Sequence, residues 1–123
     1  MVFRTKTSKR TMEIYDYIYQ REHLQPYALA KISIALAIHA KYQFEGTNAD
    51  SAGLDLNRQT ITGDHDLLFK KLIELNEGKS IPEEDYFPNY VKAYMDFGAT
   101  LLEQEYKYSN DIYTHLMELE KGI

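Results

Sequence analysis

The residue types best suited to catalysis or metal binding stand together at Asp64-His65-Asp66. Two carboxylates and an imidazole are suitable ligands for a divalent metal ion. Adjacent side chains of a helix point about 100° apart, so these three would not converge on one ion without a ligand from elsewhere in the chain. Carboxylates at a helix start more commonly cap free N–H groups and meet the positive end of the helix dipole. We therefore expect a helix start here, with no metal ion.

Other patterns typical of catalysis are absent from the sequence. The remaining histidines, His23, His39 and His115, are scattered and are better explained as structural residues than as acid–base catalysts. There is no Gly-rich phosphate loop, no Walker sequence and no Gly-x-Ser-x-Gly nucleophile turn. The chain has no cysteine, which excludes disulfides, thiolate nucleophiles, zinc fingers and iron–sulfur ligation. We expect no catalytic residue and no cofactor.

A second group of candidate residues is the basic N-terminal segment, which contains Arg4, Lys6, Lys9 and Arg10 and no acid. On an extended chain Arg4 and Lys6 lie on the same side. A short basic strand ahead of two helices is typical of ribbon-helix-helix DNA binders, whose paired ribbons enter the major groove. The alternative is a solvated, frayed terminus, which is common for charged chain ends.

Charge is distributed unevenly along the chain, whose net charge is −5. Residues 1–41 carry seven Lys or Arg and three Asp or Glu, whereas residues 42–123 carry seven Lys or Arg and sixteen Asp or Glu. A protein that binds nucleic acid over its whole surface would be basic throughout. We therefore expect one basic edge, with Lys31 of the same basic half as a further candidate DNA contact. The acidic remainder would aid solubility or meet a basic partner.

The elements that position these residues are predicted to be mostly helical. Ser8 is a suitable N-cap for a first helix to about residue 22, and Pro26 suits the first position of a second helix over residues 26–42. Residues 28–40 are apolar nearly all round, which predicts burial on more than one side. In so small a chain, one covering surface is expected to be another subunit, so we expect a homo-oligomer.

The second half is predicted to contain a loop over residues 45–53, an extended segment over residues 54–62, and further helices. A helix opens at residues 63–66 with Leu68, Leu72 and Leu75 facing the core, and it stops at Gly78. Residues 80–83 have capping-box spacing, which predicts a brief helical turn.

The longest helix is predicted to start at Pro88 and to run to about residue 107, with Gly98 on its buried face at a close backbone approach. Ser109 or Asn110 would cap a last helix, with its apolar side chains facing inward at Ile112, Leu116 and Leu119. The predicted fold class is mainly α: a ribbon-helix-helix-like N-terminal part, made of a short basic strand and two helices, then a short extended segment and further helices.

Length and hydrophobicity indicate one domain over residues 1–123, since 44% of the residues are hydrophobic. No signal peptide is visible, and the most apolar stretch, residues 28–40, is too short to span a bilayer. We expect a soluble cytoplasmic protein that does not contact the membrane.

The central segment, residues 53–69, reads Gly-Leu-Asp-Leu-Asn-Arg-Gln-Thr-Ile-Thr-Gly-Asp-His-Asp-Leu-Leu-Phe. It closely resembles the signature of the DndE family of DNA sulfur-modification proteins, with His65 where the family commonly has an aromatic Tyr. The chain length, the basic Phe-Arg start, the two leading helices and residues 91–102 also fit the family. The resemblance covers most of the chain and indicates a single DndE-like domain.

This resemblance implies a role in DNA phosphorothioation, in which sulfur replaces a non-bridging oxygen of the DNA backbone. Family members are small and helical, and they work with a cysteine desulfurase and other modification subunits, which would carry out sulfur transfer. The family is associated with binding nicked duplex DNA, and nicking has been proposed for some members. Asn57 and Arg58 match the signature. In one interpretation their role is structural: Asn57 orders a turn, and Arg58 pairs with an acid such as Asp55 or Asp64. In the other interpretation the two residues contact DNA.

Three functions compete at this point. The leading one is a non-catalytic DNA-binding subunit of the phosphorothioation machinery, and the second is a metal-dependent DNA nickase that uses Asp64, His65 or Asp66. The third is a ribbon-helix-helix repressor or antitoxin. Such proteins usually end soon after the second helix, whereas here residues 43–123 follow it and carry the family signature.

Overall fold

The computed structural model describes residues 4–46 and 50–109. The predicted last helix, with Asn110, Ile112, Leu116 and Leu119, lies outside the described residues, as does His115.

The fold is mainly helical with a two-stranded antiparallel sheet, which confirms the predicted fold class. The elements are β1 (Arg4–Lys6), α1 (Lys9–Glu22), α2 (Pro26–His39), β2 (Asp55–Asn57), α3 (Arg58–Ile61), the 3₁₀ turn η1 (Gly63–His65), α4 (Asp66–Glu77), α5 (Glu83–Asp85), the π-helical η2 (Tyr86–Val91) and α6 (Lys92–Ser109).

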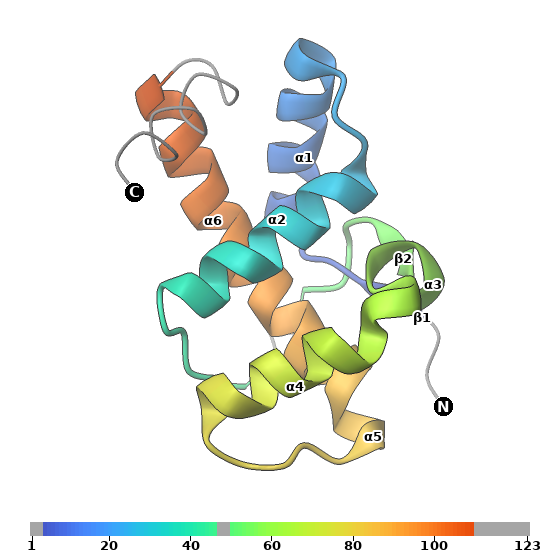
Figure 1. Ribbon diagram of the computed structural model, residues 1–123. Coiled ribbons are helices and arrows are strands. Elements are labelled where there is room, and N and C mark those ends of the chain that lie inside the picture. The colour runs from blue at the N-terminus through green and yellow to red at the C-terminus, as the bar shows by residue number, and fades with distance from the viewer. Residues whose placement is uncertain (1–3, 47–49, 110–123) are drawn as a thin grey trace.

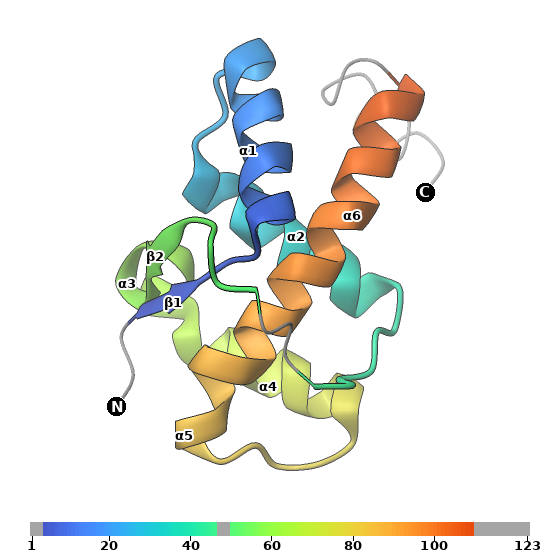
Figure 2. The ribbon, with the colours of Figure 1, turned by 180° about the vertical axis from the view of Figure 1, so that it is seen from behind.

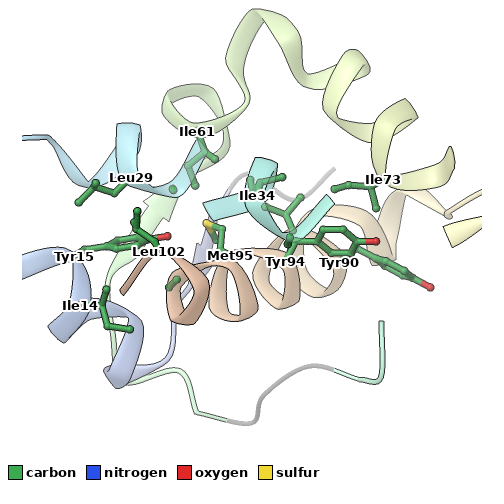
Figure 3. Packing of buried hydrophobic residues seen from close by; sticks show 14 of the residues in the cluster. Ile14, Tyr15, Leu29, Ile34, Ile61, Ile73, Tyr90, Tyr94, Met95 and Leu102 are labelled. Atoms are coloured by element: carbon green, nitrogen blue, oxygen red, sulfur yellow. The ribbon is translucent and has the colours of Figure 1, made fainter. Parts of the chain in front are cut away.

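Helix α2 lies across α6, with α1 above it and α4 below it in Figure 1. The buried side chains of all these helices meet along α6. Figure 3 shows Tyr15 of α1, Leu29 of α2 and Leu102 of α6 on one side of this core, and Ile34, Ile73 and Tyr94 on the other. The buried side chains of α2 form one helix face, with Leu29, Ser33 and Ala37 at its centre. The opposite face, with Tyr27, Lys31 and Ala35, is exposed, so the prediction that this helix is buried on more than one side is not confirmed.

The two strands pair within one chain. In the antiparallel register Arg4 lies opposite Asn57 and Lys6 opposite Asp55. The predicted extended segment is correct only for Asp55–Asn57. The side-chain oxygen of Asn57 accepts a hydrogen bond from the backbone N–H of Gln59 at 2.7 Å, and this cap turns the chain into α3.

The starts of the two leading helices are as predicted. The Ser8 hydroxyl accepts a hydrogen bond from the Thr11 N–H at 3.1 Å, and Pro26 occupies the first position of α2. Helix α2 ends at His39, earlier than predicted. The close approach at Gly98 is confirmed, because a Cβ built there would lie 1.8 Å from the carbonyl oxygen of Ser33. Helices α2 and α6 therefore touch backbone to backbone at this point.

The predictions for α4 and its neighbours need two corrections. His65, not Asp64, occupies the N-cap position of α4, and no side chain caps this helix. The predicted capping box is also wrong, since Pro82 precedes α5 and no side chain caps it. The brief helical turn does form, and it continues through η2 into α6, so the longest helical run begins before Pro88.

The largest difference concerns the leucines of α4. Ile73 is fully buried and Phe69 packs against the core, whereas Leu68, Leu72 and Leu75 are exposed. The prediction that the three leucines face the core is therefore wrong. Both sets have helical spacing, and the structure buries the Phe69–Ile73 side.

Candidate nucleic-acid interface

Strand β1 leads directly into α1 (Figure 2), and four of the predicted basic residues belong to these two elements. Arg4 and Lys6 are exposed on one face of β1, and Thr5 between them is buried. Lys9 and Arg10 are exposed in the first turn of α1. We call these four cations the basic edge.

Acidic side chains reduce the charge of this edge. Arg4 forms an ion pair with Asp55 on the paired strand, with 3.2 Å between Nε and Oδ1, and Arg10 pairs with Glu103 of α6. Within residues 4–46 and 50–109, neither Lys6 nor Lys9 forms a salt bridge. The two lysines are therefore the cations of the edge that are most available to a phosphate.

The edge also ends abruptly along α1. Glu13 and Asp16 are exposed on the next turns of the helix and line a groove of about 450 Å³ between α1 and the start of α2. Carboxylates at this position would repel a phosphate backbone. A nucleic acid would therefore meet the ribbon and the N-terminus of α1, and not the length of the helix.

A buried network fixes the start of α1. The Asp96 carboxylate accepts hydrogen bonds from the Ser8 N–H at 3.1 Å and from the Thr11 hydroxyl at 2.6 Å. Lys92, which is buried, donates to Asp96 at 3.0 Å and to the carbonyl oxygen of Asp50 at 2.8 Å. The backbone N–H groups of Ala52 and Lys9 lower the pKa of Asp50. Lys9 and Arg10 thus project from a helix start that hydrogen bonds hold to Asp96 of α6.

Lys31 lies away from the ribbon, on α2. Its ammonium nitrogen is 5.7 Å from the ring centroid of Tyr27, and both residues are exposed. An exposed cation beside an aromatic ring can neutralise a phosphate and offer a stacking surface to a base. Lys31 therefore forms a separate candidate contact.

Arg58, the other predicted contact, is buried, with 8% of its side chain exposed. Its guanidinium donates to Asp66 twice, Nε to Oδ1 at 3.1 Å and Nη2 to Oδ2 at 2.5 Å. Nη1 lies 2.7 Å from Oε1 of Glu83, and the guanidinium carbon is 5.0 Å from the ring centroid of Tyr86. Arg58 does pair with acids, but the predicted partners, Asp55 and Asp64, are wrong.

We call the side chains that surround this guanidinium the Arg58 network: Arg58, Thr62, Asp66, Glu83 and Tyr86. Hydrogen bonds and charges within the network shift the pKa values of its ionisable members. Burial alone would raise the pKa of Asp66, but hydrogen bonds from Arg58, Thr62 and Tyr86 and the Arg58 charge hold it below its ordinary value. The Arg58 hydrogen bond lowers the pKa of Glu83, and the carboxylates raise the pKa of Arg58. All three groups are therefore charged at neutral pH.

This geometry separates the three residues of the Asp64-His65-Asp66 cluster. Asp66 turns inward to Arg58, while Asp64 and His65 are exposed. Among the described residues, no three side chains of the His, Asp and Glu types are placed to hold a metal ion. Asp66 can act here as the acceptor of a structural ion pair.

Comparison with known proteins places this chain in a family. The family model described as "DNA sulphur modification protein DndE" matches residues 4–110. The chain belongs to the DndE family. Its fold is similar to the crystal structure of DndE from Escherichia coli B7A, described as involved in DNA phosphorothioation modification. The TM-score is 0.65 and the identity 14%, over 83% of this chain and 97% of that chain. The comparison with curated proteins found no match.

The DndE family match covers the basic edge and the Arg58 network, and it ends just after α6. In the described part of the chain, no helix is both long enough and apolar enough to cross a membrane. Sequence reasoning missed the structural roles of Asp66, Glu83 and Tyr86. The one available signal was the signature itself, which contains both Arg58 and Asp66 eight positions apart.

Proposed function

We propose that this member of the DndE family is a non-catalytic DNA-binding subunit of a DNA phosphorothioation system. It binds duplex or nicked DNA through the basic edge, with Lys6 and Lys9 as the main phosphate contacts and Arg4, Arg10 and Lys31 as additional ones. Arg58 is left out of this surface because its guanidinium is buried against two carboxylates. The single observation that carries the proposal is the family match over residues 4–110.

The chemistry of the chain supports a binding role. Without cysteine it offers no thiol to carry sulfur, so a cysteine desulfurase and other subunits of the system would supply that step. The carboxylate that a nickase would need at Asp66 is engaged by Arg58 and Thr62. The partners of the chain in this proposal are DNA, the other phosphorothioation subunits and further copies of itself, in the cytoplasm.

A binding assay with cleavage readout tests this proposal. Fluorescence anisotropy would compare an intact duplex with the same duplex carrying one nick, with Mg²⁺ or with a chelator, and a denaturing gel would then report strand cleavage. We expect binding to both DNAs at low salt and no new cleavage in either condition. No binding to either DNA at low salt would overturn the proposal. Metal-dependent cleavage that a folded Asp64→Asn or Asp66→Asn variant lacks would establish the nickase instead.

A further inference from the structure

The groove between α1 and the start of α2 combines apolar walls with two carboxylates. Its volume is about 450 Å³, within the range of roughly 300–1,000 Å³ that is typical of ligand sites. Its lining is mostly apolar apart from the two acids, and the residues that matter here are Met12, Glu13, Asp16, Tyr19, Pro26 and Leu54. We call these residues the acidic groove.

The two carboxylates of the acidic groove lack a cationic partner in the described part of the chain. Glu13 and Asp16 are exposed, and neither forms a salt bridge within residues 4–46 and 50–109. Asp16 accepts one hydrogen bond, from the Gln20 amide at 3.5 Å. Because about one helical turn separates the two acids, their charges repel each other. A cation brought to the groove would remove this repulsion.

The walls of the acidic groove are held in place by hydrogen bonds within the chain. The Leu54 N–H donates to the Thr7 hydroxyl at 2.9 Å, and the Leu54 carbonyl accepts from the Thr7 N–H at 2.9 Å. Pro26 begins α2, and the Gln25 carbonyl before it accepts from the Leu29 N–H at 3.1 Å. A preformed site binds at a lower entropic cost, because little of it has to be ordered.

The same two acids border a second hollow, so the surface extends along α1. This hollow, of about 530 Å³, shares Glu13 and Asp16 with the acidic groove and adds Tyr17, Gln20 and Arg21. The Arg21 guanidinium lies over the Tyr17 ring, with its carbon 4.5 Å from the ring centroid. Two adjoining hollows with the acids between them suit a stretch of polypeptide better than a single small amine.

We propose that the acidic groove binds a basic segment of a partner protein, in which apolar side chains lie between arginines or lysines. An apolar side chain would enter beside Met12 and Leu54, and the cations would pair with Glu13 and Asp16. The ring of Tyr19 can pack against the methylene groups or the guanidinium of an arginine. The same carboxylates repel a phosphate backbone, which excludes nucleic acid as the occupant. This binding goes beyond the proposed function and does not depend on DNA.

The contact should be weak and sensitive to salt. Exposed ion pairs contribute little each, and the acidic groove accepts only a short part of a partner. We expect a dissociation constant on the order of 0.1–1 mM for an isolated peptide. A chain of net charge −5 also attracts any cationic peptide, so the probes must separate this general attraction from binding in the groove.

Fluorescence anisotropy of labelled peptides with the full chain tests the inference. The probe is Gly-Arg-Leu-Leu-Arg-Gly. Gly-Arg-Gly-Gly-Arg-Gly keeps its charge without the apolar side chains, and Gly-Glu-Leu-Leu-Glu-Gly keeps the leucines with the charge reversed. We expect the wild type to bind the probe at least about tenfold more tightly than either reference peptide. Arginine amide, a small cation, should compete with the probe about tenfold less effectively than unlabelled probe does.

Substitution of the two acids tests the site. Glu13→Gln/Asp16→Asn should weaken binding of the probe by about five- to tenfold, because two ion pairs are lost. Glu45→Gln/Glu84→Gln removes the same charge from exposed positions outside the groove and should bind the probe like the wild type. Glu13→Lys/Asp16→Lys should instead prefer Gly-Glu-Leu-Leu-Glu-Gly. All these positions are exposed, so circular dichroism should show folded variants.

Four results would overturn the inference, and DNA binding would stand in each case. The first is a wild type that does not bind the probe at millimolar concentrations. The second is equal binding of Gly-Arg-Gly-Gly-Arg-Gly, which would mean attraction by charge alone. The third is equal competition by arginine amide, which would mean a site for a small cation. The last is an equal loss of affinity in the groove variant Glu13→Gln/Asp16→Asn and in its control, which would mean that the groove is not the site.

Discussion

Arg58 and Asp66 are eight residues apart, yet two hydrogen bonds join the guanidinium and the carboxylate side by side, Nε to Oδ1 and Nη2 to Oδ2. The pair connects the end of the β1–β2 ribbon, through α3, to the first residue of α4. Thr62 and Tyr86 donate to the same Asp66 oxygen at 2.6 and 3.2 Å. The segment of this chain that resembles the family signature therefore contains a structural ion pair, which holds the ribbon against the helical core.

Arg58→Lys should destabilise the fold. Lysine is a point charge and does not reproduce the planar fork that meets Asp66 and Glu83 together. We expect a loss of about 1–3 kcal/mol, below the range for a fully buried pair because both acids are partly exposed. Urea unfolding measures it, with Arg21→Lys at an exposed site as the control. Equal stability of both variants would refute this role for Arg58.

Asp66 should also make stability depend on pH. Its pKa is lowered in the folded state, so its stabilising contribution is present above the unfolded value of about 3.9 and is lost as the pH falls through the folded pKa. At neutral pH, Asp66→Asn should be less stable than the wild type. The gap between the two proteins should narrow as the pH drops below about 4, and urea unfolding across this range would show it. A gap that stays constant would mean that the ionised carboxylate contributes nothing.

Gly98→Ala should reverse the usual effect of this substitution. In a helix interior, replacing Gly by Ala normally stabilises by about 0.5–1 kcal/mol. Here the new methyl would lie 1.8 Å from the Ser33 carbonyl oxygen, so α2 and α6 would have to move apart. We expect a loss of about 1–3 kcal/mol or more in thermal or urea unfolding. Thr100→Ala, at an exposed position on the same helix, is the control and should change stability little.

The parts of the fold that local chemistry determines could be predicted from the sequence. Ser8 and Pro26 act within one helical turn, so the starts of α1 and α2 follow from residue type alone. Gly98 stands in a long apolar pattern, and close packing is the main reason to keep glycine there. Asn57 also acts locally as a cap, but the alternating Thr and Ile residues after it favoured a strand and concealed the start of α3.

The parts that depend on tertiary packing could not be predicted. Helix α4 has apolar residues on two sides, and periodicity alone does not tell which side, Phe69 with Ile73 or Leu68 with Leu72, meets the core. The Arg58 network was equally hidden, because Glu83 lies 25 positions from Arg58 and no local pattern links them. The basic edge was visible as a charge cluster, whereas the partners of its arginines, Asp55 and Glu103, were not.

The salt dependence of duplex binding tests the central claim most directly. Three proteins would be compared: the wild type, Lys6→Ala/Lys9→Ala at the basic edge, and Arg21→Ala/Lys41→Ala. The control pair removes the same charge from two exposed positions, Arg21 in the last turn of α1 and Lys41 just after α2. Each phosphate contact that is lost lowers the slope of log affinity against log salt by about 0.9.

The account predicts that Lys6→Ala/Lys9→Ala binds more weakly and has a slope smaller by about 1–2 per bound chain, whereas Arg21→Ala/Lys41→Ala keeps the wild-type slope. Circular dichroism would verify that both variants are folded. An unchanged affinity and slope for Lys6→Ala/Lys9→Ala, or an equal loss in the two variants, would contradict a DNA interface at the basic edge.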